Sequence, residues 1–316
     1  MNFIEHIDNI VKSYGISNYN IQKFRSVYKI NSKDRILLIK KFNSKTKLFN
    51  TKKIINHLKY NNFKYIQNIY YNLKNEFYFE FENKFYACFS WVDGREVNIK
   101  NVKEIKKCTK TIYLFHESIK NVNDFSMILK DNSDWIEKFE EDIFNLYDIK
   151  NKLTKVNSLS ELDKFYYENI DKAILKISEI INILNENNFN KFLSENKIIC
   201  HSSLYYQNFI LGKNDKIYLI DFGGISLNNR VYDLARFARR VFYKNSFDTK
   251  VLNDIYKVYN KYYKFSEFEK TLFDSYLKHP YKFVKLGYRF YIQNKNIDEL
   301  RLLNKLKKYC KYELNL

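Results

Sequence analysis

Short alternating runs of hydrophobic and polar residues dominate the first ninety positions of the chain. Runs 23–30 and 35–42 are rich in β-branched and aromatic residues, and the turn-like sequence Asn-Ser-Lys-Asp between them predicts a hairpin. A second pair, 75–81 and 84–92, predicts another hairpin around Glu-Asn-Lys. Between the pairs, residues 46–63 carry Leu and Ile at helical spacing. We therefore expect the order strand, strand, helix, strand, strand.

Helical periods dominate the chain from about residue 99 onwards. Hydrophobic residues recur on one helical face over 102–119, and the period lasts for nearly thirty residues over 159–186. Ser160 is placed to cap the second of these helices. Two apolar runs, Asn-Phe-Ile-Leu and Lys-Ile-Tyr-Leu-Ile-Asp-Phe, interrupt the helical pattern and predict a short hairpin. Only residues 151–160 read as a linker.

A change from strand patterns to helix patterns suggests where the chain divides. Gly94, one of six glycines in the chain, lies in the connector between the two kinds of pattern. We expect a β-rich N-terminal lobe over 1–88, a hinge over 89–98 and a helical C-terminal lobe over 99–316. The predicted hairpin lies within 200–224 of the helical lobe.

Composition places the chain among soluble globular proteins. It has 316 residues, of which 45% are hydrophobic and 29% charged, and contains no run of about 18 apolar residues that would predict a membrane span. The first residues lack the features of a secretory signal, so we expect synthesis in the cytoplasm. The four cysteines are far apart, which favours reduced thiols over a zinc site or disulfides.

The net charge of +19 raises the possibility of a nucleic-acid or polyanion partner. The residue choice is, however, rich in Lys, Asn, Ile, Tyr and Phe, as expected from an AT-rich genome. No recognisable repeat of basic and stacking residues accompanies the charge. One local feature is not explained by this overall residue choice: residues 35–75 contain ten Lys or Arg and no Asp or Glu.

The segment around the predicted hairpin has the layout of a phosphoryl-transfer site. Asn208 and Asp221 stand at the two ends of the hairpin, which would bring them together, and oxygen ligands from Asp and Asn suit the divalent metal that such chemistry needs. His201 precedes Asn208 by seven positions. Taken alone, Asn208 is more simply interpreted as a turn residue, and Asp221 as the residue that ends a strand. The combination of His201, Asn208 and Asp221 favours a phosphoryl-transfer site.

This pattern resembles a known superfamily. The stretch "HSSLYYQN", followed by "IDF", resembles the HxDxxxxN motif and metal-binding Asp of the aminoglycoside phosphotransferase and protein-kinase-like superfamily. Three further stretches, "FSWVDGRE", "YLFHESIK" and "LKHPYKFVKLGYRFYIQNK", are similar to the CotS-type spore coat family within it. Together the matches cover about residues 24 to 295. The resemblance implies an α+β, protein-kinase-like bilobal fold with a small antiparallel sheet in one lobe and a larger helical lobe.

The resemblance also implies roles for individual residues. Lys40 matches the lysine that contacts the nucleotide phosphates, while Lys41 points to the other strand face and is expected to be solvated. Asn208 and Asp221 match ligands of Mg²⁺. A further group matches positions that hold adenine through the hinge backbone: Phe89, Ser90 and Trp91.

Two other matched residues support the catalytic loop. His201 corresponds to a residue that braces the loop. In "VYDLARFARR" (231–240), Asp233 corresponds to the acid that supports it from behind.

Two departures from the superfamily pattern weaken the case for catalysis. Ser203 occupies the position of the catalytic Asp, and no carboxylate lies between His201 and Asn208 to replace it. Ser is no base near neutral pH, and the loss of a general base costs about 10² to 10⁴ in rate. The expected helix over 46–63 also holds no acid, so the usual Lys–Glu pair of the small lobe cannot form there.

The leading hypothesis is therefore a CotS-like spore coat protein, a pseudokinase whose catalytically degenerate kinase fold acts in coat assembly. It implies other spore coat proteins as partners, location in the spore coat, and binding of ATP and Mg²⁺ that is weakened or lost. The alternative is an ATP-dependent small-molecule phosphotransferase acting on a hydroxyl of a sugar or amino alcohol. A third class, a binder of nucleic acid or another polyanion, has less support.

Overall fold

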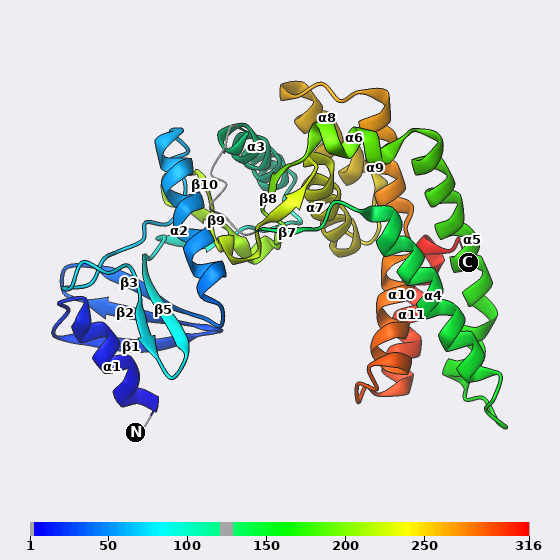
Figure 1. The fold of residues 1–316 in the computed structure, drawn as a ribbon, viewed down its shortest axis with the longest axis horizontal. Helices are drawn as coiled ribbons and strands as arrows, with labels where there is room; N and C mark the ends of the chain where they lie inside the picture. Colours follow the sequence, from blue (N-terminus) through cyan, green and yellow to red (C-terminus); the bar gives the residue numbers. More distant parts are fainter. Residues whose placement is uncertain (1–2, 121–128, 316) are drawn as a thin grey trace. The chain divides into compact units, whose positions relative to one another are not determined.

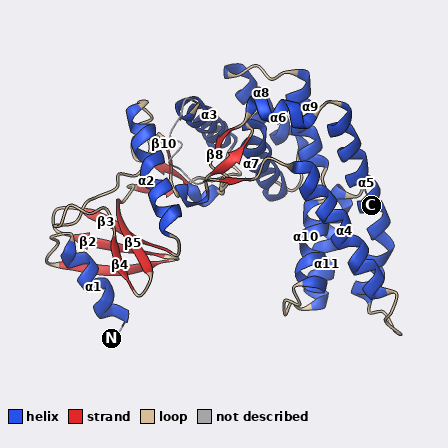
Figure 2. Cartoon of the chain, viewed as in Figure 1, coloured by secondary structure: helices blue, strands red, loops and turns tan. Residues whose placement is uncertain are grey.

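The computed structural model describes residues 3–120 and 129–315. Its chain divides into two compact units: unit 1 consists of Met1–Lys130 and Ile198–Tyr263, and unit 2 of Asp131–Lys197 and Lys264–Leu316. Figure 1 shows the order of the elements, and Figure 2 shows that helices predominate outside the N-terminal sheet. The lobe boundary expected over 89–98 stays a prediction, because the units divide the chain at other positions.

The N-terminal part of unit 1 is a five-stranded sheet in which each neighbouring pair is antiparallel. The strands, in spatial order, are β1 (Tyr19–Phe24), β2 (Val27–Ser32), β3 (Ile36–Phe42), β5 (Lys84–Ser90) and β4 (Phe79–Phe81). The hairpin whose second strand was predicted over 35–42 is confirmed in outline, with β2 and β3 as its strands. The hairpin predicted from 75–81 and 84–92 is also confirmed in outline, with β4 and β5 as its strands. Strand β4 is shorter than expected.

The single strand predicted over 23–30 is wrong, because a tight turn divides it. Strand β1 ends at Phe24 and β2 begins at Val27, so Arg25 and Ser26 form a two-residue loop. Arg25 has a φ of 54°, in the left-handed region that Gly usually occupies in such turns. Since the sequence has neither Gly nor Asn at this point, its hydrophobic alternation reads straight through the turn.

The two faces of the sheet have different neighbours. Helix α1 (Phe3–Ser13) packs on one face, where Ile10 and Val11 meet Leu37 and Ile39 of β3 in a buried cluster. Because side chains alternate along a strand, Leu38 and the half-buried Lys40 lie on the other face. Lys41 is exposed, as expected. The alternation of β3 thus decides which lysine faces the rest of unit 1.

Helices predicted from hydrophobic periodicity in unit 1 form nearly where expected. Helix α2 (Lys45–Tyr60) begins after Ser44, whose hydroxyl accepts a hydrogen bond from the Lys47 N–H. Helix α3 (Val102–Ile119) begins after Asn101, which caps it in the same way. The matching bounds follow from strong caps combined with buried Leu and Ile at helical spacing.

The remainder of unit 1 consists of short strands followed by helices. Strands β6 (Gly94–Glu96), β9 (Phe209–Gly212) and β10 (Ile217–Leu219) form a small antiparallel sheet, so the predicted hairpin is confirmed. Strand β8 (Ile198–Cys200) pairs with β11 (Ser226–Asn228). Two single-turn 3₁₀ helices, η1 (Tyr206–Asn208) and η2 (Phe222–Gly224), and the helices α7 (Arg230–Lys244) and α8 (Thr249–Tyr262) complete it. Strand β7 (Lys130–Asp131) lies where units 1 and 2 meet in the sequence.

Unit 2 is helical. Helix α5 (Glu161–Glu186) begins at a capping box in which Ser160 and Asp163 exchange hydrogen bonds, as the predicted N-cap implies. The other elements are α4 (Trp135–Leu153), α6 (Phe189–Asn196), α9 (Glu267–Lys278), α10 (Tyr281–Gly287), the π-helix η3 (Tyr288–Ile292) and α11 (Glu299–Glu313). Among the described residues, no helix is both long enough and apolar enough to cross a membrane.

Helices α5 and α10 pack closely within the core of unit 2. The rings of Tyr166 and Phe283 stack with their centroids 4.2 Å apart, and the Tyr166 hydroxyl donates to the Phe283 carbonyl over 3.2 Å. Gly287 faces the same ring so closely that a Cβ at this position would overlap the Tyr166 ring and hydroxyl.

The Gly287→Ala variant should therefore lose about 1 to 3 kcal/mol of unfolding free energy, because the buried Tyr166 ring must move. Urea unfolding measures the change. Lys285→Ala, on the exposed side of the same helix, is the control and should change stability by less than about 0.5 kcal/mol. Equal stability of wild type and Gly287→Ala would contradict the packing described for α10.

Candidate functional site

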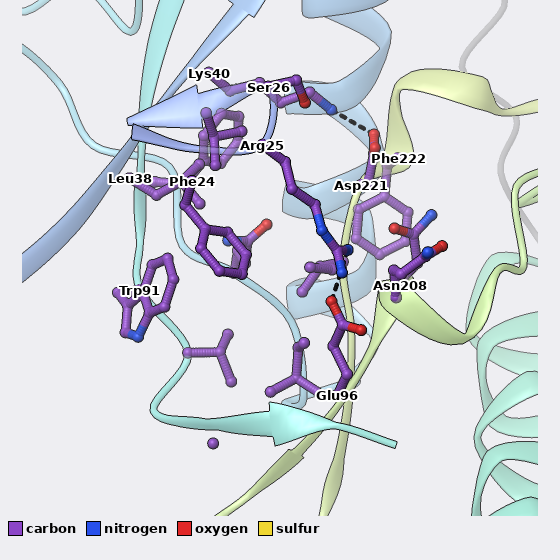
Figure 3. Close-up of a pocket in the computed structure, with 18 of the residues that line it drawn as sticks. Phe24, Arg25, Ser26, Leu38, Lys40, Trp91, Glu96, Asn208, Asp221 and Phe222 are labelled. Atoms are coloured by element: carbon purple, nitrogen blue, oxygen red, sulfur yellow. Dashed lines mark hydrogen bonds and ion pairs between the residues drawn. The ribbon is translucent and has the colours of Figure 1, made fainter. Parts of the chain in front are cut away.

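A pocket of about 480 Å³ lies within unit 1, a size typical of small-molecule sites. Its walls come from the β1–β2 turn, β3, α2, β5, β6 and the segment from η1 to η2 (Figure 3). Hydrophobic side chains including Leu38, Phe89 and Ile210 form much of the lining. Of the residues predicted from the sequence, five line this one pocket: Lys40, Phe89, Trp91, Asn208 and Asp221.

Lys40 and Asp221 form an ion pair across the pocket (Figure 3). Burial alone would raise the pKa of the Asp221 carboxyl, but the nearby Lys40 ammonium outweighs burial and lowers the pKa below its ordinary value. Asp221 also accepts a 3.3 Å hydrogen bond from the Gly223 N–H. The residue is held at a φ of 67°, an unusual conformation for a side chain other than Gly. Lys40 thus reaches Asp221 itself, a contact that the sequence did not predict.

Asn208 and Asp221 stand at the ends of the β9–β10 hairpin. The Ile220 N–H, next to Asp221, donates to the Asn208 carbonyl over 3.0 Å. The Asn208 side-chain amide donates to the Ser203 carbonyl over 2.7 Å, which leaves its Oδ1 as the group able to meet a cation. An amide oxygen and a carboxylate oxygen are hard donors that suit Mg²⁺ when phosphates and water complete its shell. The donor set therefore fits this metal.

His201 is a buried brace for the loop that carries Ser203. Its Nε2 lies 3.1 Å from the Ile220 carbonyl, and the Ser203 N–H lies 3.3 Å from its Nδ1. Burial lowers the pKa of the imidazole below its ordinary value, so the ring is neutral. A neutral ring with these partners donates from Nε2 to Ile220 and accepts at Nδ1 from Ser203. Both ring nitrogens are therefore engaged in positioning backbone.

Asp233 anchors the same loop from α7. Its buried carboxylate accepts hydrogen bonds from the backbone N–H groups of His201 at 2.6 Å and Ser202 at 2.8 Å. Burial by itself raises the pKa of this carboxyl, but its contacts with His116, His201 and the Ser202 N–H together outweigh burial and lower the pKa. The support predicted for Asp233 and His201 is thus consistent with their contacts, and their roles remain proposals.

His116 is a residue of this network that sequence reasoning gave no role. Its Nε2 lies 3.3 Å from Asp233 Oδ2, and its Nδ1 lies 2.6 Å from the Tyr259 hydroxyl. Burial lowers the pKa of the His116 imidazole, so the neutral ring accepts from Tyr259 and donates to Asp233. The stretch "YLFHESIK" pointed to this residue only through resemblance. Its partners lie more than 100 positions away, on α7 and α8.

Ser203 packs closely against η2. A Cβ on Gly224 would overlap the Ser203 hydroxyl, so the absence of a side chain at position 224 is what allows the loop and η2 to approach. The Ser203 carbonyl also accepts from the Tyr205 N–H at 2.7 Å and from Asn208. The half-buried Ser203 side chain therefore lies directly against Gly224.

The predicted adenine-binding segment is partly engaged within the protein. The Ser90 N–H donates to the Asn68 carbonyl at 2.9 Å, and the Ser90 carbonyl accepts from the Gln67 side chain at 3.1 Å. The Trp91 N–H donates to the Ile36 carbonyl over 3.3 Å. Phe89 and Trp91 present side chains to the pocket. Their role in holding adenine remains a prediction.

Sequence reasoning missed an ion pair across the pocket, between Arg25 of the β1–β2 turn and Glu96 of β6. Its nitrogen and oxygen atoms lie 2.6 Å apart (Figure 3). Neither position carried a local signal, because the turn lacks Gly and Glu96 lies in a strand of only three residues. Helix α2, which contains no Asp or Glu, contributes Thr51 and Ile55 to the pocket lining. It therefore offers no carboxylate to Lys40.

The chain belongs to the spore coat kinase family. Residues 7–315 match the family model described as "Spore coat putative kinase YutH". This match covers nearly the whole chain and confirms the CotS-like resemblance. No curated protein matches the chain in sequence.

Solved structures show the same kinase-like fold, although their sequences differ widely from this one. An aminoglycoside phosphotransferase from Alicyclobacillus acidocaldarius has a TM-score of 0.84 at 15% identity, with 96% of this chain and 93% of that chain covered. The AMP-bound spectinomycin phosphotransferase APH(9)-Ia has a TM-score of 0.70 at 17% identity, with 98% of both chains covered. An ethanolamine kinase from Plasmodium vivax has a TM-score of 0.58 at 17% identity, with 96% of this chain and 84% of that chain covered. The predicted fold class is confirmed.

Buried neutral His116 and His201 predict a loss of stability on mild acidification. Their folded-state pKa values lie below the ordinary value of 6.5, so below that pH the unfolded chain binds protons that the folded chain does not. Unfolding free energy should fall by about 1.4 kcal/mol per pH unit for each histidine, until the folded pKa is reached. The lowered carboxyl pKa values of Asp221 and Asp233 add a further loss below about pH 4.

Urea unfolding between pH 7.5 and 5 measures the slope. His116→Gln should remove about half of the histidine contribution, whereas His57→Gln, at a half-exposed position on α2, serves as the control and should keep the wild-type slope. A stability that does not change from pH 7.5 to 5 would contradict the assignment of two neutral buried rings.

Proposed function

We propose that this spore coat family member keeps a nucleotide-binding cleft, has lost efficient phosphoryl transfer, and acts in coat assembly as a folded component. The observation that carries the proposal is Ser203, which stands at the base position of a loop whose supporting contacts are otherwise complete. His201 and Asp233 still order that loop. The loss therefore concerns the reacting group more than the scaffold around it.

Several features support retained nucleotide binding. The pocket offers an apolar wall for a base, and its cation Lys40 lies beside the Asn208 and Asp221 pair. Asn208 and Asp221 are the residues that would hold Mg²⁺. The ion, when bound, neutralises charge on the nucleotide phosphates. AMP occupies one structural relative, and ADP with spectinomycin occupies another structure of the same enzyme.

Two features argue against efficient transfer. The Ser203 hydroxyl cannot take a proton from an acceptor near neutral pH, and the missing base costs about 10² to 10⁴ in rate. Lys40 has no carboxylate partner among the α2 residues that line the pocket, and pairs with Asp221 instead. The lysine and the proposed metal ligand therefore neutralise each other. A ligand must separate them before both can act on its phosphates.

A second function is kept open by the same site. Lys40, Asn208, Asp221 and Asp233 are all present, and phosphoryl transfer depends mainly on positioning and electrostatics. A slow ATP-dependent phosphotransferase acting on a hydroxyl of a sugar or amino alcohol is therefore the alternative. Relatives in structure are named for aminoglycosides and ethanolamine. Measured ATP consumption separates the two functions.

The family membership supports further proposals about the protein's surroundings. Other spore coat proteins are the proposed partners, and the spore coat is the proposed location. Nucleic acid is not a proposed partner, because the positive charge of +19 comes without a recognisable nucleic-acid motif.

ATP with Mg²⁺ should raise the melting temperature of the wild-type protein. At a ligand concentration one hundred times Kd, binding to the folded state alone adds about 2.7 kcal/mol of stability. Asp221→Ala should abolish the Mg²⁺-dependent part of the shift. Asp215→Ala is the matched control, since Asp215 is an exposed Asp in the β9–β10 turn that pairs with Lys107 at 2.5 Å. No shift in the wild type at saturating ATP would mean that the cleft has lost nucleotide binding.

Ser203→Asp should not restore transfer. The added carboxylate must fit where the Ser203 hydroxyl already packs against Gly224, and Lys40 remains without an α2 carboxylate. ATP consumption, with and without sugar or amino alcohol acceptors, should rise by less than about tenfold. Ser203→Asn is the matched control for size without charge. A larger gain, or wild-type turnover in the usual enzyme range of about 1 to 10³ per second, would favour the phosphotransferase alternative.

A further inference from the structure

The turn between β1 and β2 sends an arginine into the pocket. Arg25 and Ser26 are the only residues between the paired ends Phe24 and Val27, and both line the pocket. Figure 3 shows the Arg25 side chain extending from this turn towards Glu96. Lys40, Asn208 and Asp221 line the same pocket.

Contacts of Arg25 and of residues on both sides of it hold this turn against Trp91 and Glu96. Phe24 meets the Trp91 ring edge-on, with centroids 5.9 Å apart, and the Lys29 ammonium lies 4.6 Å from the centre of the Trp91 ring. Arg25 adds the 2.6 Å ion pair with Glu96 of β6. The turn is thus fastened to the segment that follows β5.

The backbone of this turn is suited to presenting a side chain. A two-residue loop has too few N–H groups to surround a chain of phosphates, which is what a longer glycine-rich loop does. Arg25 nevertheless holds a φ of 54°, where Gly would be easier. Such strain persists where the surrounding structure fixes it, and it is concentrated at functional positions. Arg at this point exchanges backbone donors for a planar guanidinium that binds phosphate through two parallel hydrogen bonds.

The pair with Glu96 is weak enough to be exchanged. The Arg25 side chain is 53% exposed and that of Glu96 is 28% exposed, and exposed ion pairs contribute little to stability. A ligand anion can therefore take the guanidinium at little cost. Arg95, which also lines the pocket, is a poorer candidate, because Glu104 holds it with two hydrogen bonds of 2.9 and 2.7 Å.

We propose that Arg25 is the phosphate-binding cation of this pocket, which Glu96 holds in the present structure and releases to the phosphates of a nucleoside di- or triphosphate. The inference rests on the proposed nucleotide binding. Lys40 behaves in parallel, since it too leaves a carboxylate of the far wall, Asp221, to meet phosphate. Binding thus exchanges two protein ion pairs for two cation–phosphate contacts, and the Glu96 carboxylate opposes binding.

Calorimetric titration tests this with three probes: ADP, adenosine and inorganic tripolyphosphate. Arg25→Gln should weaken ADP and tripolyphosphate by about tenfold, the effect of losing one charge-assisted hydrogen bond, and leave adenosine unchanged. Glu96→Gln should tighten ADP several-fold, and this gain should vanish in the double variant Arg25→Gln/Glu96→Gln. Arg35→Gln removes an exposed Arg from another turn of the same sheet. It is the control and should change affinity by less than about twofold.

Each other outcome has a definite meaning. Equal ADP affinity in wild type and Arg25→Gln, or an equal loss for adenosine, overturns the proposal, as does weaker ADP binding by Glu96→Gln. If the wild type binds neither ADP nor adenosine, nucleotide binding has failed. The tripolyphosphate arm then decides: sensitivity to Arg25→Gln supports the proposal, and insensitivity or no binding overturns it. If Arg25→Gln unfolds, the Glu96→Gln titration decides, because that variant leaves the turn intact.

Discussion

The buried carboxylate of Asp233 is the interaction on which the arrangement of the site depends. Taking a carboxylate out of water costs several kcal/mol unless hydrogen bonds compensate it. Here the backbone N–H groups of His201 and Ser202 and the ring of His116 provide that compensation. The same bonds fix the loop from His201 onwards, and with it Ser203 and Asn208. A charge on α7 thus sets the position of groups that line the pocket.

The loop support and the reacting groups of this protein are therefore separable. The network of Asp233, His201, His116 and Tyr259 orders backbone and would do so whatever residue occupied position 203. None of these contacts involves a side-chain atom of residue 203. The loop is therefore well ordered with Ser at position 203.

Two ion pairs join the N-terminal sheet to other segments that line the pocket. Lys40 of β3 meets Asp221, and Arg25 of the β1–β2 turn meets Glu96. Each is partly exposed, so neither locks the pocket. Together they keep a strongly basic protein from presenting bare cations in an apolar cleft. They also leave these cations able to meet phosphate once a ligand competes for them.

Much of the fold and part of the site followed from the sequence because the signals were local. Ser44, Asn101 and Ser160 cap helices whose buried residues recur at helical spacing, so α2, α3 and α5 begin where predicted. The β9–β10 hairpin follows from two apolar runs around a turn. The alternation along β3 chose Lys40 over Lys41 as the residue facing the pocket. The sequence also shows directly that α2 and residues 201–208 contain no Asp or Glu.

What only the tertiary structure decided were the contacts between distant segments. Lys40 and Asp221 are 181 positions apart, and His116 lies 117 positions from Asp233, so no local pattern could pair them. The turn at Arg25 escaped detection because a strained φ at a non-Gly residue leaves no mark in the sequence. Propensity and periodicity act over a few residues, whereas a pocket gathers side chains from many segments. The sequence by itself determined the elements and the absence of an acid at 201–208, and the packing of those elements decided which charges meet.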